Sequence, residues 1–255
     1  MPDVNRRLSV LADSELFAPD CRFRLSGTMR TGLFPSLFLL ECRNLSDADV
    51  FRLRNTKELS VLREDSCLAS GRVSDVFCRT VPEGTVTAVA FSLGLDLWET
   101  SVSLSVPAGV SVSETVRRIL AASGTGVQLL SFPGSDPVFS RGQAFFGRAA
   151  ECVASALSAA SARCYLVPAG LCVLPAEPLP ATLHLSGKDL TDRPALADGG
   201  KKLILSTSVT GFQPGEEMTL AYGGKTYAGL ILERMTEADT ALGPWNTQLL
   251  VELHG

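Results

Sequence analysis

The segment Met218–Leu232 reads MTLAYGGKTYAGLIL and gives the clearest structural signal of the chain. In it, two runs of apolar and β-forming residues flank the pair Gly223-Gly224. Glycine readily adopts the positive φ angles that a two-residue hairpin turn requires. The segment therefore predicts a β-hairpin.

Most of the remaining chain consists of short apolar or alternating runs separated by turn residues. Such spacing is typical of a β-barrel or a β-sandwich. Residues 1–19 predict a loosely held arm or a short helix, and Ser46, with Asp47 and Asp49 after it, predicts the start of a helix. Further strands are predicted at residues 21–25, 37–42, 59–62, 70–77, 85–91, 98–106, 182–185, 202–206 and 248–253.

The periodicity changes after Pro107. Ser111 and Glu114 stand at the spacing of a capping box, in which the two side chains satisfy each other's free backbone amides. The apolar stripe that follows predicts a helix, and Gly124 ends it. A second, alanine-rich helix is predicted at about 144–161. Two short strands are then predicted at 163–167 and 170–174.

Two parts of the β-rich sequence resemble each other. Lys57–Leu62 reads KELSVL and Glu216–Ala221 reads EEMTLA, and a glycine-containing turn and an apolar strand follow each of them. Each block closes with a Trp-x-Thr triplet, at Trp98–Thr100 and Trp245–Thr247, which hold the only two tryptophans. Several matches in the same order favour a duplicated β-domain, and chance similarity between strands is the alternative.

The predicted fold class is therefore α+β and mostly β, with two similar β-barrel or β-sandwich domains and a small α+β insert between them. A chain of 255 residues is long enough for two to three small domains. The predicted segments are an N-terminal arm at 1–20, a first β-domain at 21–106, the insert at 107–180 and a second β-domain at 181–255.

The composition is that of an ordered protein, with 45% hydrophobic and 20% charged residues and a net charge of −4. Such a balance gives no electrostatic reason to expect nucleic acid or an anionic membrane as a partner. No stretch approaches the roughly 18 apolar residues of a membrane span, and the N-terminus lacks the apolar core of a secretory signal. We therefore expect synthesis in the cytosol.

The seven cysteines do not predict a metal or redox site. No pair has CxxC spacing, and the chain contains only two histidines. We expect the cysteines to be small buried hydrophobic residues in a reducing compartment. They are Cys21, Cys42, Cys67, Cys78, Cys152, Cys164 and Cys172.

A search for catalytic groups yields no candidate. His184 alternates with leucines in a predicted strand and His254 is the penultimate residue, so both suit surface histidines rather than bases for a nucleophile. The glycine-containing segment Ala122–Gly126 lacks the lysine of a phosphate-binding loop, and its glycines suit a helix end and a turn. We therefore expect no catalytic residue and no enzyme.

The acidic residues likewise do not form a recognisable site. The side chains of Glu216 and Glu217 would point to opposite faces of a strand, which argues against a paired acid and base. Three loop aspartates could bind Ca²⁺, but their spacing differs from that of an EF-hand loop. They are Asp189, Asp192 and Asp198. We expect solvated loop acids, with no cofactor and no metal.

Taken in order, these features resemble the baseplate hub proteins of tailed phages and related injection machines, including the late control gene D family. The likeness covers most of the chain from about residue 22. The stretches that carry it are Leu33–Leu37 (LFPSL), Asn44–Asp47 (NLSD), Val106–Val110 (VPAGV), Ser140–Gln143 (SRGQ), Phe146–Ala149 (FGRA) and Gly243–Thr247 (GPWNT).

The resemblance implies a homotrimer in which two similar tube-type β-domains per subunit form a pseudo-sixfold ring. Such a ring would join a hexameric tail tube, or a distal tail protein, to a trimeric central spike. The internal similarity between the two β-rich blocks is what this symmetry conversion would require. The resemblance also implies assembly in a bacterial host cytoplasm and a final place in the virion tail.

Two further expectations depend on this resemblance. A tube-type domain places one sheet face toward a lumen, and the alternating serines Ser101, Ser103 and Ser105 would suit that face. The chain is also shorter than the longer family members, which leaves open whether it contacts a spike. The alternatives to a hub are another tail or baseplate adaptor and a monomeric ligand-binding β-module.

Overall fold

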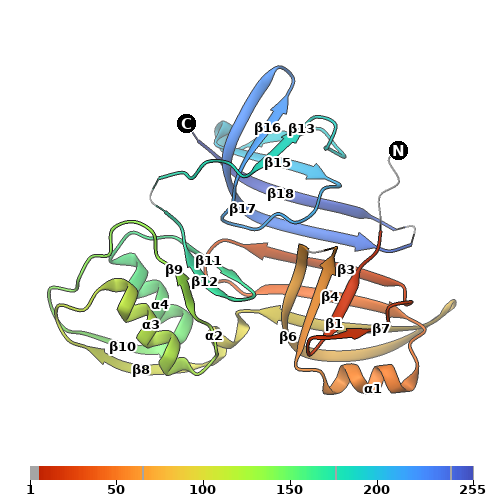
Figure 1. Ribbon diagram of the computed structural model, residues 1–255, viewed down its shortest axis with the longest axis horizontal. Helices are drawn as coiled ribbons and strands as arrows, with labels where there is room; N and C mark the ends of the chain where they lie inside the picture. The colour runs from red at the N-terminus through yellow and green to blue at the C-terminus, as the bar shows by residue number, and fades with distance from the viewer. Residues whose placement is uncertain (1–5, 65, 176, 242, 255) are drawn as a thin grey trace. The chain divides into compact units, whose positions relative to one another are not determined.

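The computed structural model describes residues 6–64, 66–175, 177–241 and 243–254, and the chain divides into two compact units (Figure 1). Unit 1 comprises Met1–Met29, Ser36–Ser92 and Ala181–Gly255, and unit 2 comprises Arg30–Pro35 and Leu93–Pro180. The chain is mostly β with few helices, as the sequence predicted. The second unit begins earlier than the insert that the sequence predicted at 107.

Thirteen strands of the described chain form one large sheet in unit 1. Its strands are β1 (Ser9–Ala12), β2 (Glu15–Phe17), β3 (Phe23–Arg30), β4 (Ser36–Arg43), β5 (Glu58–Arg63), β6 (Ser66–Val81), β7 (Gly84–Leu93), β13 (Leu183–Ser186), β14 (Ala195–Ala197), β15 (Lys202–Thr207), β16 (Glu217–Tyr222), β17 (Lys225–Asp239) and β18 (Trp245–Leu253). The helix α1 (Asp47–Asn55) and the 3-10 turn η1 (Asp198–Gly200) also belong to this unit.

The order of strands in this sheet repeats. In the first half, β5 pairs with β6, β6 with β7, and β7 with β4, while β3 flanks β4. In the second half, β16 pairs with β17, β17 with β18, and β18 with β15, while β14 flanks β15. Strands β3 and β17 join the halves, as Figure 1 shows. Each half therefore places four consecutive strands in the same neighbour order.

Local irregularities repeat as well. The register between β6 and β7 shifts between Val73 and Asp75, and the register between β17 and β18 shifts between Ile231 and Glu233. Both shifts lie near the middle of the long strand of their half. A bulge bends a strand and increases its twist, so β6 and β17 are bent at corresponding places.

Of the two sequence matches, one falls on corresponding strands of the sheet and the other does not. Lys57–Leu62 and Glu216–Ala221 fall on β5 and β16, which hold corresponding positions in the strand order. The match between the two tryptophans was wrong. Trp245 opens β18, whose counterpart is β7, whereas Trp98 lies on the helix α2 (Leu95–Glu99) in unit 2.

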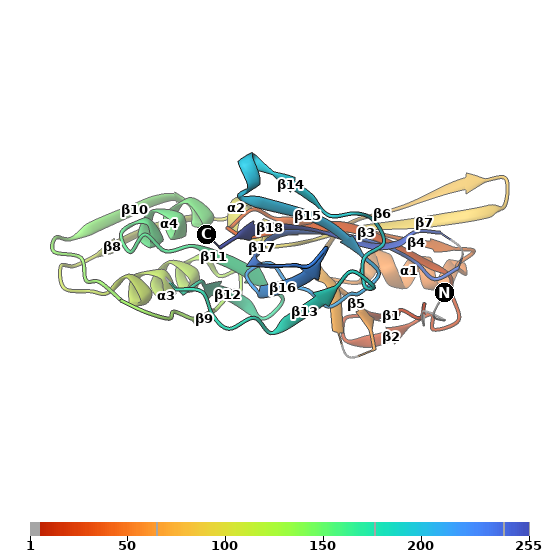
Figure 2. The ribbon, with the colours of Figure 1, turned by 90° about the horizontal axis from the view of Figure 1, so that it is seen from above.

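The hairpin predicted at Met218–Leu232 is confirmed. Strands β16 and β17 pair antiparallel from Tyr222 and Lys225 onward, and the turn residues Gly223 and Gly224 have φ angles of 61° and 76°. Figure 2 shows a second long hairpin, made by β6 and β7, that extends beyond the neighbouring strands. Its outer part is mostly exposed and includes Phe77, which is 43% exposed.

The predicted N-terminal arm or helix is corrected by the structure over its described part. Ser9–Ala12 and Glu15–Phe17 form a hairpin, and its first strand pairs antiparallel with β5. Val10 and Phe17 are fully buried in unit 1. The sequence showed only a short apolar stretch here, and the strand exists because β5 offers it a partner edge.

Unit 2 contains the remaining elements. Its strands form a two-stranded and a three-stranded sheet, and α3 and α4 pack against each other (Figure 1). The further elements are β8 (Ser101–Val106), α3 (Val112–Ser123), β9 (Leu129–Ser131), β10 (Gln143–Arg148), α4 (Ala149–Ser158), β11 (Cys164–Val167) and β12 (Gly170–Val173).

The predicted helix caps are confirmed in part. Ser46 caps α1 by accepting a hydrogen bond from the Asp49 amide at 3.2 Å. Ser111 caps α3 by accepting one from the Glu114 amide at 3.3 Å, and Gly124 ends that helix with a φ of 64°. The reciprocal half of the box is replaced, because the Glu114 carboxylate accepts from Arg118 Nε at 2.8 Å.

The second predicted helix begins later than expected. Phe145 and Phe146 lie on β10, which pairs antiparallel with β8, and α4 starts only at Ala149. Apolar spacing alone could not separate the strand from the helix, since Phe145 is buried and Phe146 is 88% exposed in the alternation of a strand.

Candidate functional site

The two histidines do not form a catalytic constellation. His184 Nδ1 lies 2.7 Å from Thr219 Oγ1, between the parallel strands β13 and β16. His254 Nε2 lies 2.7 Å from Glu217 Oε2. A catalytic triad needs a nucleophile, a base and an acid that orients the base. Among the described residues, no contact adds a third such group to His184–Thr219 or to His254–Glu217.

The acidic residues that the sequence singled out are dispersed. Asp189 accepts hydrogen bonds from the amide and hydroxyl of Ser186, and Asp198 pairs with Lys202 at 3.0 Å. Asp192 accepts from the Arg193 amide at 2.7 Å. Within the described ranges, no three His, Cys, Asp or Glu side chains converge as a metal site.

Glu216 and Glu217 point to different partners, as the strand periodicity predicted. Glu216 accepts a hydrogen bond from the Gln213 amide at 2.8 Å, whereas Glu217 contacts His254. Burial raises the pKa of the Glu216 carboxyl, and the nearby hydrogen bond and Arg234 act in the opposite direction. The two carboxylates therefore have separate structural contacts.

The seven cysteines are free thiols, but only three are buried: Cys42, Cys152 and Cys164. Cys78 is exposed and the other three are half-buried, so the prediction of buried hydrophobic residues was wrong for these four. Burial raises the pKa of the Cys164 thiol to about 12. A thiol that stays protonated at neutral pH is a poor nucleophile.

A groove with aromatic residues lies in unit 2, and we call it the aromatic groove. It encloses about 360 Å³ between residues 31–34, Trp98, α4 and residues 162–164. The rings of Phe34 and Trp98 stack with centroids 6.1 Å apart, and Trp98 Nε1 donates to the Leu33 carbonyl at 2.6 Å. Phe34 is nevertheless 62% exposed. Sequence reasoning did not find this groove.

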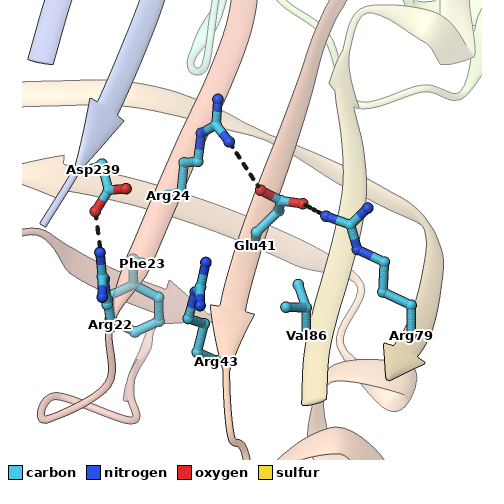
Figure 3. A pocket seen from close by; sticks show the side chains of 8 residues that line it. All are labelled: Arg22, Phe23, Arg24, Glu41, Arg43, Arg79, Val86 and Asp239. Atoms are coloured by element: carbon cyan, nitrogen blue, oxygen red, sulfur yellow. Dashed lines mark hydrogen bonds and ion pairs between the residues drawn. The ribbon is translucent and has the colours of Figure 1, made fainter. Parts of the chain in front are cut away.

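A second pocket, the arginine pocket, lies in unit 1 and is drawn in Figure 3. It encloses about 90 Å³. Guanidinium groups from β3, β4, β6 and the residue before β3 surround it, together with two carboxylates and two buried apolar side chains. The lining residues are Arg22, Phe23, Arg24, Glu41, Arg43, Arg79, Val86 and Asp239.

The serines that were predicted to face a lumen are exposed, while Val102 and Val106 on the other face of β8 are buried. Strand β8 pairs with β10 in the small sheet of unit 2, not with the large sheet. That this face lines a lumen stays a prediction. In the part of the chain that the structure describes, no helix is both long enough and apolar enough to cross a membrane.

Solved structures of other proteins have a similar architecture, although sequence comparisons find no match. No protein-family model matches the sequence, and no curated protein matches it. Solved structures do match: a tail protein from Neisseria meningitidis MC58 superposes with a TM-score of 0.73 at 11% identity, covering 96% of this chain and 95% of that one. The 43 kDa tail protein of prophage MuSo2 from Shewanella oneidensis gives 0.70 at 10% identity, covering 96% of both chains.

The chain has the fold of a phage tail protein. A third match extends this tail-protein fold to secretion machinery. The E. coli c3393 protein, a component of the type VI secretion system that is described as similar to the T4 tail proteins gp27 and gp5, superposes with a TM-score of 0.67 at 11% identity. The match covers 98% of this chain and 77% of that one. The resemblance to phage tail proteins that the sequence suggested is thus found in the fold.

Proposed function

We propose that this chain is a structural subunit of a phage, prophage or phage-derived tail baseplate, and that it acts through its interfaces. Its fold is that of tail proteins over nearly the whole length of two solved structures. In this proposal the protein assembles in a bacterial host and ends in the virion tail.

The finer proposal is a homotrimeric hub ring that joins the tail tube, or a distal tail protein, to the central spike. The observation that carries it is the repeated strand order β4-β7-β6-β5 and β15-β18-β17-β16 within unit 1. Two similar tube-type domains per subunit, taken three times, present six similar faces to a hexameric tube. A closed threefold ring requires head-to-tail interfaces, in which two different surfaces of neighbouring subunits meet.

The absolute mass in solution, measured by light scattering across a tenfold range of concentration, tests this proposal. We expect three times the 27.1 kDa of one chain, and ring-shaped particles in negative-stain electron microscopy. A compact monomer throughout that range, both alone and mixed with a hexameric tail-tube protein, would contradict the trimeric ring. A monomer that binds the tube protein without forming a ring would instead support another tail adaptor.

A further inference from the structure

The arginine pocket carries more positive than negative charge. Four guanidinium groups line it, and only Glu41 and Asp239 oppose them within the lining, which leaves a surplus of two positive charges. Arg43 contacts a third acid, Glu83, which lies outside the lining and is 71% exposed on its side chain. An arginine stays charged at every physiological pH, so this surplus is permanent.

Most of the ion pairs that these arginines form with the acids are longer than a hydrogen bond. Only Arg79 makes a short contact, 2.6 Å to Glu41, whereas Arg24 lies 3.8 Å from the same carboxylate. Arg22 lies 3.6 Å from Asp239, and Arg43 lies 3.6 Å from Glu83. Charge-assisted N–H···O bonds measure roughly 2.7–2.9 Å, so three of the four ion pairs are longer than hydrogen bonds.

The acids lie beneath the arginines. The side chains of Glu41 and Asp239 are 17% and 13% exposed, whereas those of the four arginines are 44–59% exposed. Phe23 and Val86 are buried beside them. The acids are therefore more buried than the arginines, and the guanidinium groups remain accessible to a partner.

We propose that the arginine pocket binds a carboxylate of an acidic segment in a partner protein. Arginine recognises carboxylates through paired N–H groups. Glu41 shows that a carboxylate fits among these side chains, since it lies 2.6 Å from Arg79 and 3.8 Å from Arg24 (Figure 3). Sites for whole small molecules enclose roughly 300–1,000 Å³, so about 90 Å³ suits one functional group of a larger partner.

A nucleic-acid backbone fits the pocket less well. The pocket of about 90 Å³ admits one anionic group and offers no continuous track for the successive phosphates of a strand. The net charge of −4 opposes the long-range attraction of any polyanion, and nonspecific nucleic-acid binding depends on that attraction, whereas a contact with one carboxylate depends on the local arginines. The pocket therefore favours a local carboxylate contact within the assembly, and the inference rests in this respect on the proposed structural role.

The test is the binding of a fluorescein-labelled hexaglutamate peptide, blocked at its C-terminus, measured by anisotropy at 50 and 300 mM NaCl. We expect the double variant Arg22→Gln/Arg43→Gln to weaken binding at least about tenfold at low salt, because two charged hydrogen-bond donors are removed. The matched control is Arg7→Gln/Arg54→Gln, which removes two exposed arginines of unit 1 and the same net charge. The control should change the dissociation constant of the peptide by less than about twofold, because isolated exposed charges contribute little to binding.

Circular dichroism checks that both double variants fold, and Arg43→Gln alone carries the test if the first one does not. No binding of the peptide to the natural chain, or equal weakening in both double variants, would overturn the proposal. A third result would also overturn it. If hexathymidylate bound more tightly than the peptide, and if Arg22→Gln/Arg43→Gln weakened that binding about tenfold, the pocket would be assigned to nucleic acid. These outcomes leave the mass measurement untouched, so the pocket and the ring can fail separately.

Discussion

Arg234 of β17 donates a hydrogen bond from Nη1 to the backbone carbonyl of Phe212 at 2.6 Å, although its side chain is only 1% exposed. Its Nη2 donates to the Leu68 carbonyl and contacts the sulfur of Met29. One buried guanidinium thus ties β3 and β6 of the first half of the sheet to the second half. Burial lowers the pKa of Arg234 to about 10, with Cys67 and Glu216 acting in the opposite direction.

Arg234→Ala should lower the free energy of unfolding by about 3 kcal/mol, because it leaves two buried carbonyls without a donor and opens a cavity. Urea unfolding in a Trp98→Phe background checks this, since Trp245 on β18 then reports on unit 1 alone. Arg54→Ala, on the exposed face of α1, is the control and should stay within about 0.5 kcal/mol. A loss below about 1 kcal/mol at Arg234 would show that water replaces the lost donors.

Asp136→Ala should destabilise unit 2 by about 1 kcal/mol at pH 7, since Asp136 accepts from the Ser113 amide at 2.9 Å and from its hydroxyl at 2.6 Å at the start of α3. Partial burial alone would raise the pKa of Asp136, but these hydrogen bonds and Arg117 lower it below its ordinary value of 3.8. A lowered folded-state pKa gives stability above the unfolded-state pKa that is lost as the pH falls through the folded-state value.

The difference between the natural chain and Asp136→Ala should therefore shrink below about pH 4. Urea unfolding at pH 7, 4 and 2.5, with Trp98 emission in a Trp245→Phe background, measures it. A difference of equal size at pH 7 and pH 2.5 would mean that the Asp136 charge contributes nothing to the cap.

Unit 2 should lose stability in alkali because of Cys164. Burial raises the pKa of this thiol from 9.0 to about 12, so the unfolded chain releases the proton first. Stability is complete below the unfolded-state pKa and falls as the pH rises from about 9 toward 12, by at most about 1.4 kcal/mol per pH unit for this one group.

Unfolding free energies of the natural chain and of Cys164→Ala at pH 8, 9 and 10.5 check this expectation, and the variant should show the shallower decline. Thiol labelling supplies an independent readout, since the exposed Cys78 should react in the folded chain and Cys164 only after unfolding. Identical slopes in the two chains would remove Cys164 as the cause.

Gly229→Ala should destabilise unit 1 by about 1–3 kcal/mol. A Cβ atom at Gly229 would collide with the backbone carbonyl of Glu252 and the side chain of Val251 on β18, and a backbone atom cannot move aside as a flexible side chain can. The neighbouring Ala228→Ser is the control, because Ala228 is exposed. Thermal unfolding by circular dichroism measures both, and equal melting temperatures would show that β17 and β18 separate at little cost.

The sequence by itself determined the local structure wherever neighbouring residues set the conformation. Gly223-Gly224 specified a hairpin, Ser46 and Ser111 specified helix starts, and Gly124 specified a helix end. Each of these signals depends on φ angles or on hydrogen bonds within a few residues, so the chain needs no distant partner to express it. The β5 and β16 similarity likewise reached the correct pair of strands.

Only the tertiary structure decided which strand pairs with which. The Ser9–Ala12 strand forms because β5 lies beside it, and Phe145 and Phe146 are in a strand because β8 pairs with them. Trp98 and Trp245 share a local pattern but lie on unrelated elements. Pairing energy comes from contacts between residues far apart in the chain, and a single sequence does not record those contacts.

The arginine pocket illustrates the same division. Arg22 and Arg24 are two residues apart in the strand predicted at 21–25, and both line the pocket. Arg43 and Arg79 come from other strands, and Asp239 comes from the other half of the sheet. A strand's own period of two sets which side chains share its face, but the register between strands sets which charges meet across it.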